Sequence, residues 1–250
     1  MAGHSHWANI QRSKGAADAK RGRLFSKLSR YILIAARNGG GDPDMNLRLR
    51  YAIDKARAVS MPKENIERAI KKGTGELEGV TFEEMNYEGY GPAGIAILVE
   101  ITTDNRARTS GEVRNIFEKG GGKMGNPGAV AWMFERKGLF VLDAASTTED
   151  ALMELALEAG ADDVKSVGKT FEITCPAEAY LTLQQALTKQ GLTPTTAELT
   201  QLPKTPIDVS VEDARRVLRL MELLDENDDV QNVYSNMNLT EEVAAAAAAE

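Results

Sequence analysis

The stretch KRGRLFSKLSRYILIAARNGGGDP at residues 20–43 decides the first part of the fold. At 100° per residue its large apolar side chains fall on one side of a helix, and the glycines after Asn38 end that helix. The opposite side carries a stripe of five cations: Lys20, Arg23, Lys27, Arg30 and Arg37. Ile34 interrupts this basic stripe. The stretch therefore predicts an amphipathic helix with one face for a core and one for solvent or a partner.

Two more helices are expected after this one. Asp42 followed by Pro43 is typical of an N-cap with proline at the first helical position, which predicts a second helix from here to about residue 60. Pro62 opens a third helix, and Gly73 closes it. Because the loops between the three helices are short, we expect them to form one small domain.

The chain changes character near residue 80, where strands begin. A buried strand is expected at Gly94–Thr102, after a turn-rich lead, and a helix at Ala107–Lys119. Residues 138–200 then follow the order βαββαβ, which is the ferredoxin-like pattern. The helix and strand after Pro206 cannot bury their apolar face alone, so Val230–Tyr234 is expected to complete the sheet that begins near residue 80.

Together these elements predict an α+β protein of three domains: an N-terminal three-helix domain, an α/β middle domain and an inserted ferredoxin-like domain. The expected boundaries are a flexible basic arm at 1–19, the three-helix basic domain at 20–75, the middle domain at 76–136 with 203–238, the inserted βαββαβ domain at 137–202, and an Ala-rich tail at 239–250.

Composition excludes several classes of protein. Hydrophobic residues make up 42% and charged residues 27%, as in an ordinary folded domain. The longest apolar runs, Tyr31–Ala36 and Gly94–Val99, are far shorter than the ~20 residues that span a bilayer. The start of the chain lacks the apolar core of a secretion signal, and the single cysteine, Cys175, allows no internal disulfide. We therefore expect a cytoplasmic protein.

Charge is distributed very unevenly along the chain. Residues 1–73 contain sixteen Lys or Arg and six Asp or Glu, a net charge of +10. Residues 74–250 contain fourteen basic and thirty-one acidic residues, a net charge of −17, which gives the overall −7. A basic arm and domain attached to an acidic body favour a nucleic-acid partner, although a solvated basic domain is the alternative.

Several long motifs resemble one family. They are MAGHSHWANI at 1–10, DAKRG at 18–22, GGGDP at 39–43, MPKENIERAIKKGTG at 61–75, YEGYGP at 87–92 and TDNR at 103–106. With these motifs the chain resembles the YebC/PmpR family over about residues 1–238. The resemblance implies three domains, the first helical and the third inserted into the second. It also implies a probable transcriptional regulator that binds DNA, or a translation factor that acts on the ribosome, as mitochondrial and some bacterial relatives do.

The sequence departs from this family in its arm. The family commonly has Lys where His6 stands, and a more basic run where Gln11, Arg12 and Ser13 stand. Phosphate contact by the arm is therefore expected to be weaker here.

The candidate nucleic-acid contacts lie in the arm and the first helix. Rings in the arm could stack on bases and cations could contact phosphates, and the basic stripe suits a phosphate backbone. The set is His4, His6, Trp7, Arg12, Lys14, Lys20, Arg21, Arg23, Lys27, Arg30 and Arg37. The alternatives are a disordered tail, a Trp7 packed on the helical domain, and a solvated helix face.

A secondary basic patch lies beside the glycine loop at 120–128. Backbone N–H groups and cations could hold a phosphate there, with ordinary loop surface as the alternative. Its members are Arg106, Arg108, Arg114, Lys119 and Lys123. The loop is not a P-loop, because Met124 follows the lysine where that motif needs Ser or Thr.

Catalysis is poorly supported by the residues. Both histidines lie in the arm, and Cys175 alternates inward on a strand. The His and Cys residues can form neither a Ser-His-Asp set nor a four-ligand metal site, so we expect no enzyme, no cofactor, no metal and no small-molecule substrate. A site built of carboxylates alone is the remaining alternative.

Three functions follow from these observations. The first is a DNA-binding transcriptional regulator that uses the arm and first domain. The second is a ribosome-associated translation factor that binds ribosomal RNA, which the absence of an evident base-reading helix favours. The third is a protein-interaction module whose acidic domains bind a partner. The sequence does not decide the oligomeric state.

Overall fold

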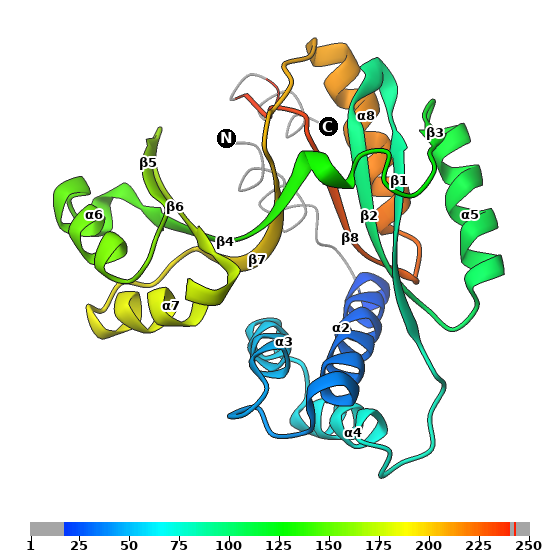
Figure 1. Cartoon of the computed structure of the whole chain (residues 1–250), viewed down its shortest axis with the longest axis horizontal. Coiled ribbons are helices and arrows are strands. Elements are labelled where there is room, and N and C mark those ends of the chain that lie inside the picture. The colour runs from blue at the N-terminus through cyan, green and yellow to red at the C-terminus, as the bar shows by residue number, and fades with distance from the viewer. Residues whose placement is uncertain (1–17, 241–242, 244–250) are drawn as a thin grey trace. The chain divides into compact units, whose positions relative to one another are not determined.

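In a computed structural model the chain forms two compact units (Figure 1). The structure describes residues 18–240 and 243, with side chains from residue 21 onward. The described parts of the first unit are residues 18–130 and 215–235, and those of the second are 131–214, 236–240 and 243.

The first unit begins with the three expected helices, α2 (Asp18–Gly39), α3 (Leu47–Ala58) and α4 (Lys63–Gly73). They share a core of apolar side chains: Leu28, Ile32, Ala35, Ala36, Leu49, Ala52, Ile53, Ala56, Met61, Ile66 and Ala69. The glycine run ends α2 as expected, because Gly40 takes a φ of 87°, a backbone conformation open to glycine.

The predicted start of the second helix was wrong. Asp42 and Pro43 lie in a turn, and α3 begins four residues later, with Asn46 as its N-cap. The Asn46 side chain accepts a hydrogen bond from the Leu49 N–H and donates to the carbonyls of Ala35 and Gly40. This buried amide therefore joins the end of α2 to the start of α3, which a cap at Asp42 could not do.

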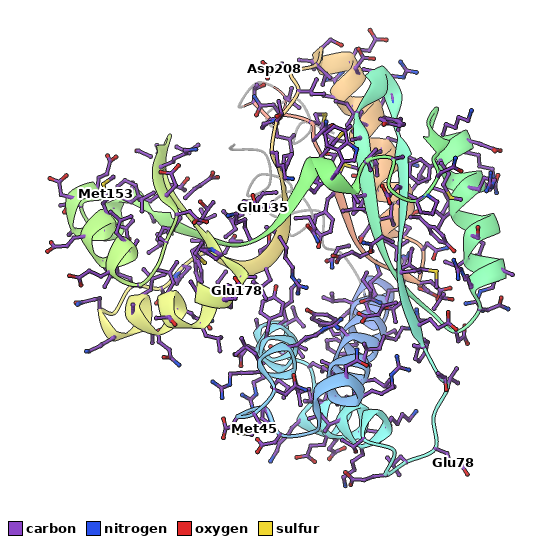
Figure 2. The ribbon with its side chains drawn as sticks, in the orientation of Figure 1. Met45, Glu78, Glu135, Met153, Glu178 and Asp208 are labelled. Carbon is purple, nitrogen blue, oxygen red and sulfur yellow. The ribbon has the colours of Figure 1, made fainter. Side chains whose placement is uncertain are left out.

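The loop that holds this turn lies at the surface. Met45 is 84% exposed and projects outward from it (Figure 2). The turn is thus exposed to solvent, and the chain becomes buried again at Asn46.

A four-stranded antiparallel sheet follows in the order β3-β1-β2-β8. Its strands are β1 (Glu83–Tyr90), β2 (Ala96–Thr103), β3 (Lys123–Met124) and β8 (Val230–Ser235). The pairing of β8 with β2 confirms that the chain returns near residue 230 to complete this sheet. The prediction of an α/β middle domain was wrong, because all three pairings are antiparallel, which is an α+β arrangement.

Strand β1 was missed because its sequence, EEMNYEGY, lacks an apolar alternation. The strand is defined by its pairing instead, since all eight of its residues pair with β2. Helices α5 (Arg106–Lys119) and α8 (Val211–Asp225) belong with this sheet. Glycines allow close approach: a Cβ on Gly89 would lie 2.7 Å from the Phe117 ring, and one on Gly120 2.5 Å from Leu220.

The second unit has the predicted βαββαβ order. Its elements are β4 (Phe134–Asp143), α6 (Glu149–Glu158), β5 (Asp163–Val167), β6 (Thr170–Pro176), α7 (Tyr180–Lys189) and β7 (Thr196–Pro203). The strands form one antiparallel sheet in the order β5-β6-β4-β7. Phe140 of β4 stacks on Tyr180 at 4.9 Å between ring centroids, which fastens α7 to the sheet.

Candidate nucleic-acid interface

Helix α2 buries its apolar face as the sequence predicted. Leu28, Ile32 and Ala35 lie in the three-helix core, and Tyr31 meets Tyr51 of α3 edge to face at 6.2 Å between ring centroids. Leu24, at the start of the helix, is 40% exposed. The core face therefore begins at Phe25, which is partly buried against this core, one residue after the predicted start.

Two members of the basic stripe do not face solvent. The Lys27 side chain is 11% exposed, and its Nζ donates to Asp225 Oδ1 at 3.0 Å. The Arg30 side chain is 20% exposed, and its Nη1 donates to Asp229 Oδ1 at 2.9 Å and to the Asp228 carbonyl. The prediction of one solvent-facing stripe was therefore wrong for Lys27 and Arg30.

The acids that hold them come from one short segment, residues 225–229, which we call the acidic turn. It reads Asp-Glu-Asn-Asp-Asp and joins α8 to β8. Ile34, on the same side of α2, is fully buried. Helix α2 thus has two buried sides, and the isoleucine that interrupted the stripe was the sequence signal for the second one.

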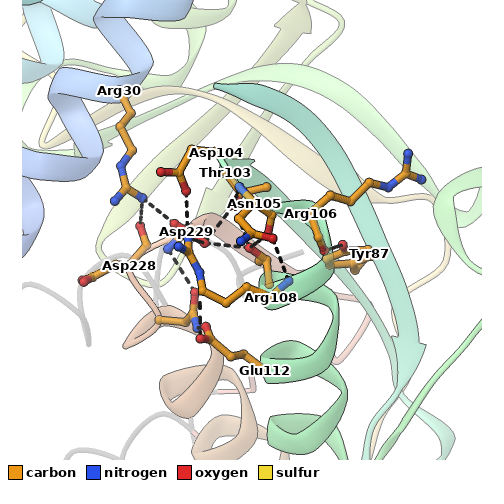
Figure 3. Close-up of polar contacts among 12 residues, drawn as sticks. Arg30, Tyr87, Thr103, Asp104, Asn105, Arg106, Arg108, Glu112, Asp228 and Asp229 are labelled. Atoms are coloured by element: carbon orange, nitrogen blue, oxygen red, sulfur yellow. Dashed lines mark hydrogen bonds and ion pairs between the residues drawn. The ribbon is translucent and has the colours of Figure 1, made fainter. Parts of the chain in front are cut away.

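Asp229 is the centre of a polar cluster beneath α2 (Figure 3). Its Oδ2 accepts hydrogen bonds from Arg108 Nη2 at 2.6 Å, Thr109 Oγ1 at 2.7 Å and Thr103 Oγ1 at 2.9 Å. Together with Arg30, these donors come from α2, β2 and α5, while the Asp229 side chain is only 4% exposed. One carboxylate from the turn therefore fastens three elements together.

The ionisation of Asp229 is set by its donors. Burial alone would raise the pKa of this carboxyl, but the hydrogen bonds from Thr109, Arg108 and Thr103 outweigh it and lower the pKa below its ordinary value. The hydrogen bond to Asp229 in turn raises the pKa of Arg108. Asp229 is therefore a buried, charged and paired carboxylate that the sequence analysis did not single out.

Six further cations of the three-helix region have no hydrogen bond or ion pair to an acid among the described residues. They are exposed, except for the half-buried Lys55. Two of them also lie over rings, Arg21 over Phe25 at 5.7 Å and Lys55 over Tyr51 at 5.6 Å. We call them the unpaired cations: Arg21, Arg37, Lys55, Arg68, Lys71 and Lys72.

Three unpaired cations lie where two helices end together. Arg37 is in the last turn of α2, and Lys71 and Lys72 are in the last turn of α4. The two ends touch, because a Cβ on Gly73 would lie 2.3 Å from the Leu33 carbonyl oxygen and one on Gly41 2.8 Å from Thr74. The helix ends therefore place three exposed positive charges in one part of the surface.

The secondary patch was weighed as a phosphate site against ordinary loop surface. Arg108 is held by Asp104 at 3.0 Å and by Asp229, while Arg106 points away from this cluster (Figure 3). The N–H groups of the loop donate internally: Gly122 to the Phe117 carbonyl and Gly125 to that of Glu88. Arg108 and these N–H groups thus have partners within the chain, which agrees with the alternative of ordinary loop surface. Contacts by Arg106, Arg114, Lys119 and Lys123 remain predictions.

The arm contacts lie outside the described residues. These are His4, His6, Trp7, Arg12 and Lys14, and the side chain of Lys20 is likewise not described. Their expected contacts with nucleic acid remain predictions.

The described part of the chain contains neither a metal-binding group nor a membrane-spanning helix. No group of three or more His, Cys, Asp or Glu side chains there could hold a metal ion. None of its helices combines the length and apolar character that a bilayer-crossing segment requires. Cys175 is buried, and burial raises its pKa to about 11, which leaves the thiol unreactive near neutral pH.

Comparison with known proteins gives consistent matches along nearly all of the chain. The model of the TACO1/YebC protein N-terminal domain matches residues 5–76, and that of the TACO1/YebC second and third domain matches residues 82–237. A probable transcriptional regulatory protein of Desulfatibacillum aliphaticivorans is 52% identical over 242 residues, which cover 97% of this chain and 98% of the relative.

Two further proteins are similarly related. A probable transcriptional regulatory protein of Geobacter sulfurreducens is 53% identical over 242 residues, again 97% of this chain and 98% of the relative. The crystal structure of a conserved hypothetical protein from Aquifex aeolicus matches with a TM-score of 0.78 at 46% identity, covering 88% of this chain and 91% of that one.

Proposed function

Because the chain belongs to the TACO1/YebC family, we propose that it is a nucleic-acid-binding regulator of gene expression that contacts phosphates through its three-helix region. The family is one of probable transcriptional regulators and not of enzymes. Its relatives' names favour DNA as the partner and a cytoplasmic location for this protein.

One observation carries the proposal: the six unpaired cations of the three-helix region. Lys27 and Arg30 are neutralised by the acidic turn, but these six are not neutralised by any described acid. Unpaired cations on one small domain release counterions when they meet a phosphate backbone, which is the main source of sequence-independent affinity. The helix ends with Arg37, Lys71 and Lys72 are the part of this surface that we assign to phosphates.

Ribosomal RNA is the second candidate partner, and the packing of α2 favours it. A base-reading helix must lie in the major groove of DNA with one long face free. Helix α2 buries one side in the three-helix core and another against the acidic turn. Contacts from helix ends and an arm suit recognition of backbone and shape, which is how proteins bind most double-stranded RNA.

The test compares two matched triple variants at one fixed salt concentration. Arg37→Gln/Lys71→Gln/Lys72→Gln removes the helix-end cations, and Arg136→Gln/Lys169→Gln/Lys189→Gln removes the same residue types from exposed positions of the second unit. At about 0.1 M salt each phosphate contact on duplex DNA is worth roughly eightfold, from about 0.9 counterions released per contact.

If two of the three helix-end cations meet phosphates at once, the first variant should bind roughly 60-fold more weakly than the parent. The control should bind nearly as the parent does. Equal affinities of the two variants for both duplex DNA and a ribosomal RNA fragment would overturn the proposed surface. The ratio of the parent's affinities for duplex DNA and for the ribosomal RNA fragment decides which partner is preferred.

A further inference from the structure

The acidic turn lies along three successive turns of the most basic helix. Arg23 Nη1 reaches the Glu226 carbonyl at 3.5 Å, Lys27 reaches Asp225, and Arg30 reaches Asp228 and Asp229. These cations are spaced four and three residues apart, so they share one side of α2. A nucleic-acid strand laid on this side would meet the same three cations.

The chemistry of the turn resembles that of a phosphate chain. Four of its five residues carry carboxylates, and its carbonyl oxygens accept from all three cations. Because the turn is part of the same chain, it competes for these cations at a high effective concentration. It can therefore withhold positive charge from an outside ligand.

The turn has a fixed part and an exchangeable part. Asp229 is buried and holds Arg30, Arg108 and two threonines, so it anchors the turn. Asp225 is 37% exposed and Asp228 is exposed, so the ion pair with Lys27 is open to solvent on its acidic side. Ion pairs of this kind are weak, and the four-carbon stem of Lys27 can swing outward without moving the helix.

We infer that the acidic turn is an autoinhibitory contact, which screens Lys27 from nucleic-acid phosphates until a phosphate chain displaces Asp225. This inference rests on the proposed nucleic-acid function, and it adds a regulatory element to that interface. Lys27 is then a reserve phosphate contact, while Arg30 stays with its anchor Asp229.

The test removes charge from the exchangeable part only. Asp225→Asn/Asp228→Asn keeps polar groups of the same size, and Glu118→Gln/Glu158→Gln removes two charges from exposed positions elsewhere. A short random-sequence DNA duplex serves as the probe, titrated over a range of salt. The first variant should bind roughly eightfold more tightly than the control at about 0.1 M salt, with a slope of log affinity on log salt steeper by about 0.9.

A third variant shows whether Lys27 is the cation released. Adding Lys27→Gln to Asp225→Asn/Asp228→Asn should remove the gain in affinity and in slope. Circular dichroism of each variant reports whether the fold is kept, and the gain in affinity itself requires a folded protein.

The outcomes separate this inference from the proposed function. If the parent binds DNA but Asp225→Asn/Asp228→Asn gains no more than the control, the autoinhibitory contact is wrong and the proposed function stands. A gain that survives Lys27→Gln also overturns the inference. If neither the parent nor any variant binds duplex DNA or a ribosomal RNA fragment, both are wrong.

Discussion

Replacing Asp229 with alanine should destabilise the first unit strongly. The carboxylate accepts four side-chain hydrogen bonds, from Arg30, Arg108, Thr103 and Thr109, while its own side chain is 4% exposed. Removing one partner of a buried ion pair costs about 3–5 kcal/mol. Part of this loss is recovered here.

The recovery comes from groups that keep other partners. Arg108 is 44% exposed and still bonds to Asp104, and the hydroxyls of Thr103 and Thr109 remain 2.7 Å apart. We therefore expect about 3 kcal/mol, the low end of the range for a broken buried pair. That is a large part of the ~5–15 kcal/mol by which domains are stable.

Urea unfolding followed by circular dichroism measures this loss, and hydrogen exchange of β2 and β8 locates it in the first unit. The matched control is Asp228→Ala, because Asp228 is exposed and contributes only its carbonyl to Arg30. The control should stay within about 0.5 kcal/mol of the parent. If Asp229→Ala is no less stable than Asp228→Ala, the polar cluster does not hold the unit together.

Two further predictions concern stability. Because the folded pKa of Asp229 is lowered, its ionised carboxylate makes its full contribution to the free energy of unfolding above the unfolded pKa of about 3.8. This contribution is lost as pH falls through the lower folded pKa. Urea midpoints should therefore drop below about pH 4, and less steeply in Asp229→Asn. Asn46→Ala removes the N-cap of α3 and leaves the carbonyls of Ala35 and Gly40 without their donor. It should cost about 2 kcal/mol in urea unfolding. Asn46→Asp keeps the cap but turns a carboxylate oxygen toward those two carbonyl oxygens, so it should lose at least as much. An Asn46→Asp protein as stable as the parent would contradict the bridging role.

The features that sequence reasoning found were those with a strong local period. Helix α2 could be predicted from its apolar face and from the glycine run at its end. The second unit could be predicted from its βαββαβ order. The pairing of β8 with the first sheet could be predicted because the helix and strand after Pro206 cannot bury their apolar faces alone. Each of these depends on burial along one element, which the chain itself displays.

The features that it missed depend on contacts far apart in sequence. Lys27 meets Asp225 across 198 residues, so a cation that looks solvated in a helical wheel is in fact paired. Asn46 was not predicted as a cap because it also donates a hydrogen bond to the preceding helix, which the local sequence does not show. Strand β1 was missed because its pairing with β2, and not its own residue pattern, makes it a strand. A helical wheel shows which residues share a face but not what covers it.

The most direct test of the proposed interface is the salt dependence of duplex DNA binding. If four cations meet phosphates at once, the slope of log affinity against log salt should be about −3.6 for the parent. Substituting Arg37, Lys71 and Lys72 with Gln should bring it toward about −1.8, since two of the four phosphates then have no cation opposite them. A parent and a variant with the same slope would contradict the assignment of phosphate contacts to the ends of α2 and α4.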